Sequence, residues 1–245
     1  MRQLLLAVRF LTIIPLGRTG EVSAKDITGS VSYYPLVGAL QGLILVVCGV
    51  VLGRWFGGGV LSCILVLILA LTNGGFHLDG FMDTVDGIAC GGDRDKRLEV
   101  MSDPAAGAVG VVFTFFIIAL KVLALGAMPE AFLLTALFLW PVAGRWSVVP
   151  LARWSSYART EGGLGEAVTE IGGREFFIAT IITLAILFFW LGLWAFLFLA
   201  IIGGLALVFS FFFKARLGGV TGDVFGFQAE VSEALFLLLL LSIAV

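Results

Sequence analysis

Charged side chains are scarce in this sequence. Only 13% of its 245 residues are charged, whereas 60% are hydrophobic, and the mean hydropathy is +1.10. A soluble domain of this length would need far more polar surface to cover its core. The net charge of −2 gives no electrostatic reason to expect nucleic acid as a partner. The composition therefore predicts a protein embedded among membrane lipids, whose few charged segments carry the functional information.

Nitrogen and sulfur ligands for metals are also few. The single histidine, His77, excludes a multi-histidine zinc site. The three cysteines, Cys48, Cys63 and Cys90, form no C-x-x-C pair, and we expect them to be small buried hydrophobic side chains. Carboxylate groups are left as the main candidates for metal ligands.

Long apolar runs indicate membrane-spanning helices, each of which needs about 20 mostly apolar residues. The candidates are residues 33–52, 60–77, 105–128, 131–151, two halves of 176–213 that divide near Gly192, and a last span that begins near Val224. This last helix would carry Glu230 and Glu233 in its first turns. The expected fold is all-α, a polytopic helical bundle of about seven transmembrane helices that forms a single membrane-embedded catalytic domain over residues 1–245.

The N-terminal segment, residues 1–17, superficially resembles a signal peptide. Arg9 interrupts its apolar run, however, and no small-residue cleavage site follows closely. We therefore expect an amphipathic helix that lies at the membrane interface.

Lysine and arginine are unevenly distributed between the two ends of the expected spans. If the first span leads outward from residue 33, twelve of the fifteen basic residues lie on its starting side. Only Arg54 lies on the opposite side, and Lys121 and Arg145 fall within spans. Because short cytoplasmic loops are enriched in basic residues, we expect every long polar loop to face the cytoplasm, where the loops could converge on one site.

Three aspartates are spaced for a common helical face. Asp79, Asp83 and Asp86 stand at i, i+4 and i+7 directly after an apolar run, and Asp103 follows in the same polar stretch. Like charges crowded near a bilayer repel one another and lose hydration, so they need a compensating cation. Mg²⁺ prefers carboxylate oxygens. We predict these four residues as metal ligands, the alternative being an acidic face that is merely solvated.

Basic residues in the polar loops suggest a phosphorylated substrate. Arginine matches phosphate oxygens with its fork of donors. The candidate substrate-binding residues are Arg94, Arg97, Arg159, Glu161, Arg216 and Asp223. The alternative is that these bases only fix the topology. Glycine-rich stretches near Glu161 and Asp223 could wrap a phosphate with backbone N–H groups, although such stretches alone are weak evidence.

Lys121 and Arg145 lie inside apolar spans, where an unpaired charge is expensive. We expect each to be paired or to face a water-filled cavity that opens to the cytoplasm. Arg145 is close enough to the end of its span to reach the membrane surface with its head group.

The run Gly74–Gly87, with its three aspartates, resembles the signature of the cobalamin 5′-phosphate synthase (adenosylcobinamide-GDP ribazoletransferase) family. Segments 10–15, 94–107, 157–162 and 218–233 also resemble motifs of this family, in order and at similar spacing. Two departures are local. Residues 104–106 lack a basic residue typical of the family, and Gly162-Gly163 contains one extra glycine.

The resemblance implies a reaction as well as a fold. A hydroxyl of α-ribazole, or of its 5′-phosphate, would attack the cobinamide-side phosphorus of adenosylcobinamide-GDP and release GMP, with Mg²⁺ as cofactor. It also implies the cytoplasmic (inner) membrane of a prokaryote. The sequence leaves room for a homo-oligomer.

Other functions compete with this interpretation. A CDP-alcohol phosphotransferase also uses D-x-x-D-G-type acids at a membrane face. A membrane prenyltransferase would bind a prenyl diphosphate through Mg²⁺ with Asn73 and the aspartates. A transporter should place its charges near the bilayer midplane, where only Lys121 and Arg145 are expected.

The general base for the attacking hydroxyl is chosen among Asp86, Asp103 and His77. Histidine has the intrinsic pKa for proton transfer at neutral pH. On a continuous helix, however, His77 points away from the face of Asp79, which favours a role in orienting a carboxylate or in ending the span. We therefore rank Asp86 first, Asp103 second and His77 third as catalytic residues.

Overall fold

The computed structural model describes residues 2–16, 22–160 and 164–244, and its regular structure there is helical. The elements are α1 (Arg2–Leu11), α2 (Ala24–Ser30), η1 (Val31–Tyr33), α3 (Tyr34–Leu52), α4 (Gly58–Thr72), α5 (Phe76–Ala89), α6 (Arg94–Val100), α7 (Ala108–Gly126), α8 (Glu130–Trp154), α9 (Leu164–Thr169), α10 (Gly173–Leu191), α11 (Trp194–Leu217) and α12 (Gly222–Ala244). An isolated parallel β-bridge joins Tyr157 to Val220. The predicted all-α class is confirmed.

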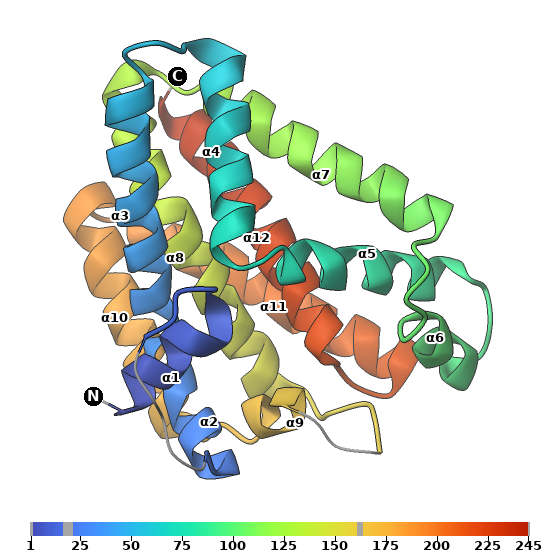
Figure 1. Ribbon diagram of the computed structural model, residues 1–245. Helices are drawn as coiled ribbons and strands as arrows, with labels where there is room; N and C mark the ends of the chain where they lie inside the picture. The colour runs from blue at the N-terminus through green and yellow to red at the C-terminus, as the bar shows by residue number, and fades with distance from the viewer. Residues whose placement is uncertain (1, 17–21, 161–163, 245) are drawn as a thin grey trace.

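Six segments are long and apolar enough to cross a membrane: α2–α3 together, α7, α8, α10, α11 and α12. Helix α4 has only 15 residues and passes the same test only together with α5, which is bent from it by 90°. Figure 1 shows α5 running across the end of α4. The described part of the chain thus has six helices able to span a membrane, or seven if the bent pair α4–α5 is one span, which agrees with the expected seven, and α5 lies outside the six.

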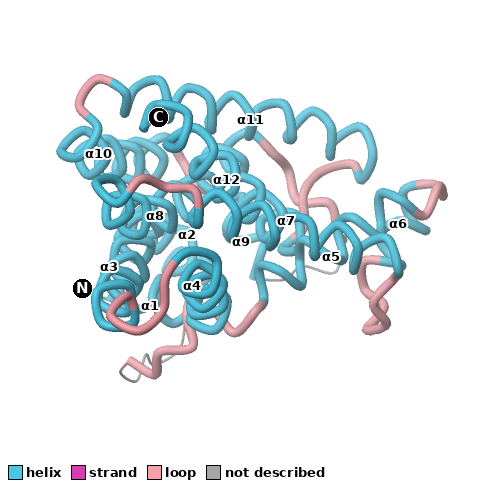
Figure 2. Tube along the Cα trace, turned by 90° about the horizontal axis from the view of Figure 1, so that it is seen from above, coloured by secondary structure: helices cyan, strands magenta, loops and turns pink. Residues whose placement is uncertain are grey.

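Helix α8 forms the centre of the bundle. It packs against α3, α10, α11 and α12, and an unbroken run of its residues from Leu139 to Ala152 is buried. Gly38 and Gly42 leave no room for a Cβ against the α8 backbone, which explains how closely α3 approaches α8. In both views α5 and α6 lie at one side of the bundle and α1, α3 and α10 at the other (Figures 1 and 2).

Several boundaries test the sequence-based expectations. The break at Gly192 is confirmed, and its φ of +56° is a conformation that glycine adopts readily. The second span ends at Thr72 rather than near His77, because Gly74 and Gly75 take φ values of +65° and +79° and turn the chain into α5. The final helix begins at Gly222, close to the expected start.

Two expectations about single side chains are wrong. Cys63 and Cys90 are exposed rather than buried, and Cys48 is only partly buried. Cys63 lies on an outward-facing side of α4, whereas Leu61 and Leu65 of the same helix face the core. The N-terminal helix α1 is amphipathic as expected, and its buried residues, including Ala7 and Leu11, pack against α2 and α3.

A buried ionic cluster joins three spans. Lys121 on α7 contacts Glu230 and Glu233 of α12 at 2.5 Å each, and Arg145 on α8 bonds Glu233 at 3.0 Å. The Arg145 Nε also donates to Gln41 at 2.8 Å. The expectation that Lys121 and Arg145 each have a partner of opposite charge is confirmed. The expectation that Arg145 reaches the surface is wrong, because its side chain is fully buried, and Glu230 and Glu233 lie in the interior of α12 rather than in its first turns.

Candidate functional site

The start of α5 is fixed by a hydrogen-bonded turn. The Asn73 side chain accepts a bond from the Gly75 N–H at 3.0 Å, and its Nδ2 lies 3.3 Å from Nδ1 of His77. His77 is 2% exposed and begins α5 beside the bend. The expectation that His77 ends the span is wrong, because α4 ends at Thr72 and His77 lies in the first turn of α5, while its rank as a base stays a prediction.

Helices α5 and α12 cross at two glycines. A Cβ at Gly80 would lie 2.8 Å from the Cα and the carbonyl oxygen of Asp223, and one at Gly226 would lie 2.8 Å from the carbonyl oxygen of His77. Only glycine permits this approach. The crossing brings Asp223, which is distant in sequence, beside the acidic face of α5.

The carboxylates at this crossing repel one another. Burial and the neighbouring charges of Asp79, Asp223 and Asp86 together raise the pKa of Asp83 to about 6, against the opposing charge of Arg159. Asp79 is exposed, whereas Asp83 and Asp223 are half-buried. A carboxyl with a pKa near 6 lies among uncompensated negative charge, which favours binding of a cation or a proton.

Asp86 and Asp103 have different surroundings. The Asp86 carboxylate accepts bonds from the N–H groups of Gly107 at 2.9 Å and Gly110 at 2.8 Å, so it caps the start of α7. Asp103 accepts a bond from the Ala105 N–H at 2.9 Å. Both residues line a cavity of about 400 Å³, which we call the Asp103 cavity.

The four predicted metal ligands therefore do not form a single cluster. Among the residues that the structure describes, no three acidic, histidine or cysteine side chains form a group able to hold a metal ion. Asp79 and Asp83 lie towards Asp223, and Asp86 lies towards Asp103. The assignment of these residues to Mg²⁺ stays a prediction.

The predicted substrate-binding arginines also separate. Arg94 donates to the carbonyls of Leu217 at 2.9 Å and Ala158 at 2.6 Å. Arg97 is buried and donates to the carbonyls of Gly92 and Ile88 near the end of α5. Both guanidinium groups thus hold backbone segments together.

Arg159 is the predicted arginine that adjoins the acidic residues. It bonds Asp223 at 3.0 Å and the Ser102 hydroxyl at 2.7 Å. Arg216 is exposed and stacks over Phe212, with its guanidinium carbon 5.7 Å from the ring centre. Glu161 lies outside the described residues.

A cavity of about 470 Å³, which we call the Tyr34 cavity, lies beside the glycine crossing. No sequence pattern predicted it. Helices α1, α3, α5, α8, α9 and α12 contribute to it. Its walls include Arg9, Tyr34, Phe76, His77, Asp79 and Asp223. Sequence patterns had pointed to three of its wall residues, His77, Asp79 and Asp223, and to the family-like segment 10–15, which includes Phe10.

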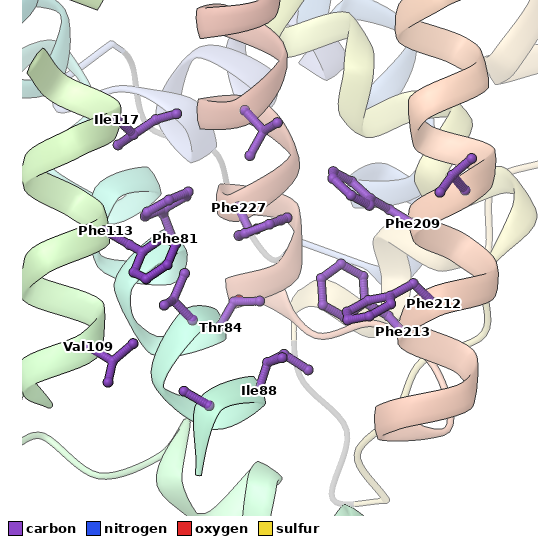
Figure 3. Close-up of a pocket in the computed structure, with 14 residues that line it drawn as sticks. Phe81, Thr84, Ile88, Val109, Phe113, Ile117, Phe209, Phe212, Phe213 and Phe227 are labelled. Carbon is purple, nitrogen blue, oxygen red and sulfur yellow. The ribbon is translucent and has the colours of Figure 1, made fainter. Parts of the chain in front are cut away.

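The reverse face of α5 is apolar. Phe81, Thr84 and Ile88 line a groove of about 480 Å³ between α7 and α11, which we call the Phe113 groove. Figure 3 shows Phe113 of α7 and Phe209 of α11 on its two sides, with Phe227 of α12 between them. This groove offers no charged group for a phosphate. Helix α5 thus separates an apolar side from an acidic side.

Comparisons with known proteins agree with this arrangement. The sequence profile of the family described as cobalamin-5-phosphate synthase matches residues 3–241. A protein of Desulforamulus reducens, named adenosylcobinamide-GDP ribazoletransferase, is 39% identical over 96% of this chain and 95% of its own length. Proteins of the same name from Geotalea daltonii and Thermoanaerobacter pseudethanolicus are 35% and 34% identical, over 99% and 100% of this chain and 98% of their own lengths. No solved structure matches the chain. Because the profile and these relatives cover nearly all of the sequence, the chain belongs to the cobalamin-5-phosphate synthase family.

Proposed function

We propose that this protein is an adenosylcobinamide-GDP ribazoletransferase. The observation that carries the proposal is the match along nearly the whole chain to a family whose members bear that name. The substrates would be adenosylcobinamide-GDP and α-ribazole or its 5′-phosphate. The competing prenyltransferase, CDP-alcohol phosphotransferase and transporter interpretations have no comparable support.

The reaction exchanges one phosphorus–oxygen bond for another. The hydroxyl oxygen of the ribazole forms a bond to the phosphorus that carries cobinamide, the anhydride bond to GMP breaks, and the hydroxyl proton leaves. Such transfers depend chiefly on positioning and on neutralising charge. Arg159 lies beside the acidic residues, as a group that contacts the diphosphate should.

We propose Mg²⁺ as the cofactor, held by Asp79 and Asp83. The donors are all oxygen, and the raised pKa of Asp83 reflects crowded negative charge that a cation would relieve. Mg²⁺ commonly binds one or two carboxylates together with substrate phosphates and water, which accounts for a protein that lacks a three-ligand cluster among its described residues. When bound, the ion would neutralise charge on the diphosphate.

The proton acceptor is also a proposal. Both carboxylate oxygens of Asp86 already accept backbone hydrogen bonds at the start of α7, which leaves this side chain fewer lone pairs for a proton. Asp79 and Asp223 both line the Tyr34 cavity, and the bonds that Asp223 accepts from Arg159 and Thr221 are both made through its Oδ2. Because Asp79 is assigned to Mg²⁺, the geometry favours Asp223 over the sequence-based ranking of Asp86, Asp103 and His77.

The orientation follows from basic residues. If the bent pair α4–α5 crosses the membrane as one span, as expected, twelve of the fifteen lysines and arginines lie on the side of the acidic site. By the positive-inside rule this side faces the cytoplasm, where soluble nucleotide substrates are available.

The test is an assay of the purified protein in lipid nanodiscs with adenosylcobinamide-GDP, α-ribazole and Mg²⁺. We expect GMP release that requires all three components. Absence of GMP release from protein that is folded and monodisperse would reject the proposed function. The same assay with α-ribazole 5′-phosphate determines which acceptor gives the higher kcat/KM.

A further inference from the structure

The Tyr34 cavity combines an apolar interior with a charged rim. Phe10, Tyr34, Phe76 and Phe225 supply aromatic surface, while Asp79 and Asp223 place carboxylates at the glycine crossing. The rings of Phe10 and Tyr34 stack with their centres 6.3 Å apart. A ligand suited to this cavity has a flat, apolar part and a polar part that reaches the acidic residues.

The size of the cavity separates the two substrates of the proposed reaction. Its volume of about 470 Å³ lies within the roughly 300–1,000 Å³ typical of small-molecule sites. A corrin ring with its side chains and adenosyl group is several times larger than a nucleoside and would not fit. A nucleoside fits, and its hydroxyl groups would then lie near Asp79 and Asp223.

The walls also separate two kinds of nucleoside. Guanine carries donors and acceptors around its edge, which need partners when buried. The dimethylbenzimidazole base of α-ribazole is mostly hydrocarbon and can stack against phenylalanine rings. The cavity has more apolar than polar lining, which favours the second kind.

One buried hydroxyl in the wall has no partner. Tyr34 is 1% exposed, and its hydroxyl makes no hydrogen bond within the described part of the chain. The Ser30 hydroxyl lies close to it and donates to the Ile27 carbonyl. A buried polar group without a partner is uncommon in folded proteins. The hydroxyl is enclosed, so a nitrogen or oxygen atom of a ligand would bond it once the Tyr34 side chain turns towards the cavity.

We propose that the Tyr34 cavity binds the base and ribose of α-ribazole, so that the acceptor approaches the acidic crossing from the side of α1 and α3. This inference rests on the proposed function for the identity of the ligand. It gives the N-terminal segment around Phe10 a role in selecting the acceptor. The corrinoid then reaches the same crossing from another side.

Two glycines permit a matched test. Gly222 and Gly173 each begin a spanning helix, neither has a positive φ, and a Cβ at either position would meet no atom within 4 Å. Gly222 lines the Tyr34 cavity and Gly173 does not. We expect Gly222→Leu to raise the KM for α-ribazole by about ten-fold or more while the KM for adenosylcobinamide-GDP stays within about two-fold. Gly173→Leu should change neither constant.

A second variant removes a single atom. Tyr34→Phe should weaken α-ribazole binding by about three- to ten-fold, the range expected for the loss of one hydrogen bond, and leave the thermal unfolding midpoint unchanged. Binding is measured at equilibrium by titrating α-ribazole, and separately GMP, into protein in nanodiscs without the corrinoid. We expect α-ribazole to bind, and GMP not to compete with it.

The outcomes are distinguishable. If Gly222→Leu raises the KM for adenosylcobinamide-GDP instead, or if GMP displaces α-ribazole, the cavity belongs to the other substrate and the inference is wrong. If the wild type releases GMP and Gly222→Leu is unaffected, the inference fails and the proposed function stands. If the wild type releases no GMP but binds α-ribazole, and Gly222→Leu does not bind it, the cavity assignment stands and the proposed function fails.

Discussion

The buried ionic cluster and the acidic crossing place charge in an apolar protein in opposite ways. In the cluster, Lys121 and Arg145 face Glu230 and Glu233, so two positive charges meet two negative ones in the centre of the bundle. At the crossing, Asp79, Asp83 and Asp223 are near one another, and Arg159 pairs with Asp223.

The difference indicates which charges maintain the fold and which serve a ligand. A buried charge must be neutralised by its neighbours, since water cannot do so. The cluster meets that requirement and joins α7 and α8 to α12. The crossing is partly open, and its negative charge is left for a ligand to balance. Four predictions test this difference between the buried ionic cluster and the acidic crossing.

The largest effect is expected in the buried cluster. Glu233→Ala leaves Lys121 and Arg145 without their shared partner, so the free energy of unfolding should fall by about 3–5 kcal/mol. The measurement is the thermal unfolding midpoint in detergent, with the yield of monodisperse protein. Glu99→Ala, which breaks the exposed pair with Lys96, is the control and should change neither. An unaltered midpoint for Glu233→Ala would show that the cluster does not require neutrality.

The second effect concerns catalysis at the crossing. Asp83→Asn removes one charge from the proposed Mg²⁺ site and should lower GMP release by at least about 100-fold, comparable to the loss of an essential electrostatic group. Folding should be retained, because the substitution removes one of several neighbouring negative charges and leaves no buried charge without a partner. Asp95→Asn, on the exposed first turn of α6, serves as the control. Near-normal release by Asp83→Asn at saturating Mg²⁺ would contradict the assignment.

The third effect separates the arginines. Arg159→Ala should raise the KM for adenosylcobinamide-GDP by about ten-fold, equivalent to about 1.4 kcal/mol, because Arg159 adjoins the acidic residues. Arg216→Ala should have little effect, since its side chain stacks on Phe212 at the end of α11. If both variants bind as the wild type does, these arginines only determine topology. A larger effect at Arg216 would extend the site along α11.

The smallest effect is a pH dependence of stability. The pKa of Asp83 is about 6 in the folded protein and 3.8 when unperturbed. The folded state therefore holds its proton to a higher pH, so stability falls as the pH rises through this window. Because Asp83 is partly exposed, solvent screening limits the effect to about 1 kcal/mol. Without Mg²⁺, the wild type should gain more stability than Asp83→Asn when the pH is lowered from 7 to 5. Equal gains would show that Asp83 is not crowded.

Local sequence patterns predicted the helices well. Apolar runs gave the spans, Gly192 marked the break between α10 and α11, and the last helix began two residues before the expected Val224. The charges inside spans were expected to be paired. Their partners were not identified, because Glu230 and Glu233 were assigned to the first turns of α12, and the depth of a residue depends on where its helix begins.

The site was predicted less completely. Helical spacing placed Asp79, Asp83 and Asp86 on one face, which follows from the period of the helix. Spacing carries no information about what packs against that face. Two backbone N–H groups at the start of α7 bond the Asp86 carboxylate. The glycine crossing places Asp223 beside the acidic face of α5. Arg94 and Arg97 hold backbone carbonyls for the same reason, since helix ends that meet in space need donors.

The sequence by itself determined that this protein lies in a membrane, that it is helical and to which family it belongs. Hydrophobicity, helix period and motif order are all properties of the linear sequence. Tertiary structure alone decided which charges are neutralised within the bundle and which remain for a ligand. It also formed the Tyr34 cavity from α1, α3, α5, α8, α9 and α12. These contacts join segments that are far apart in the sequence, and only the packing of the helices sets the distances among them.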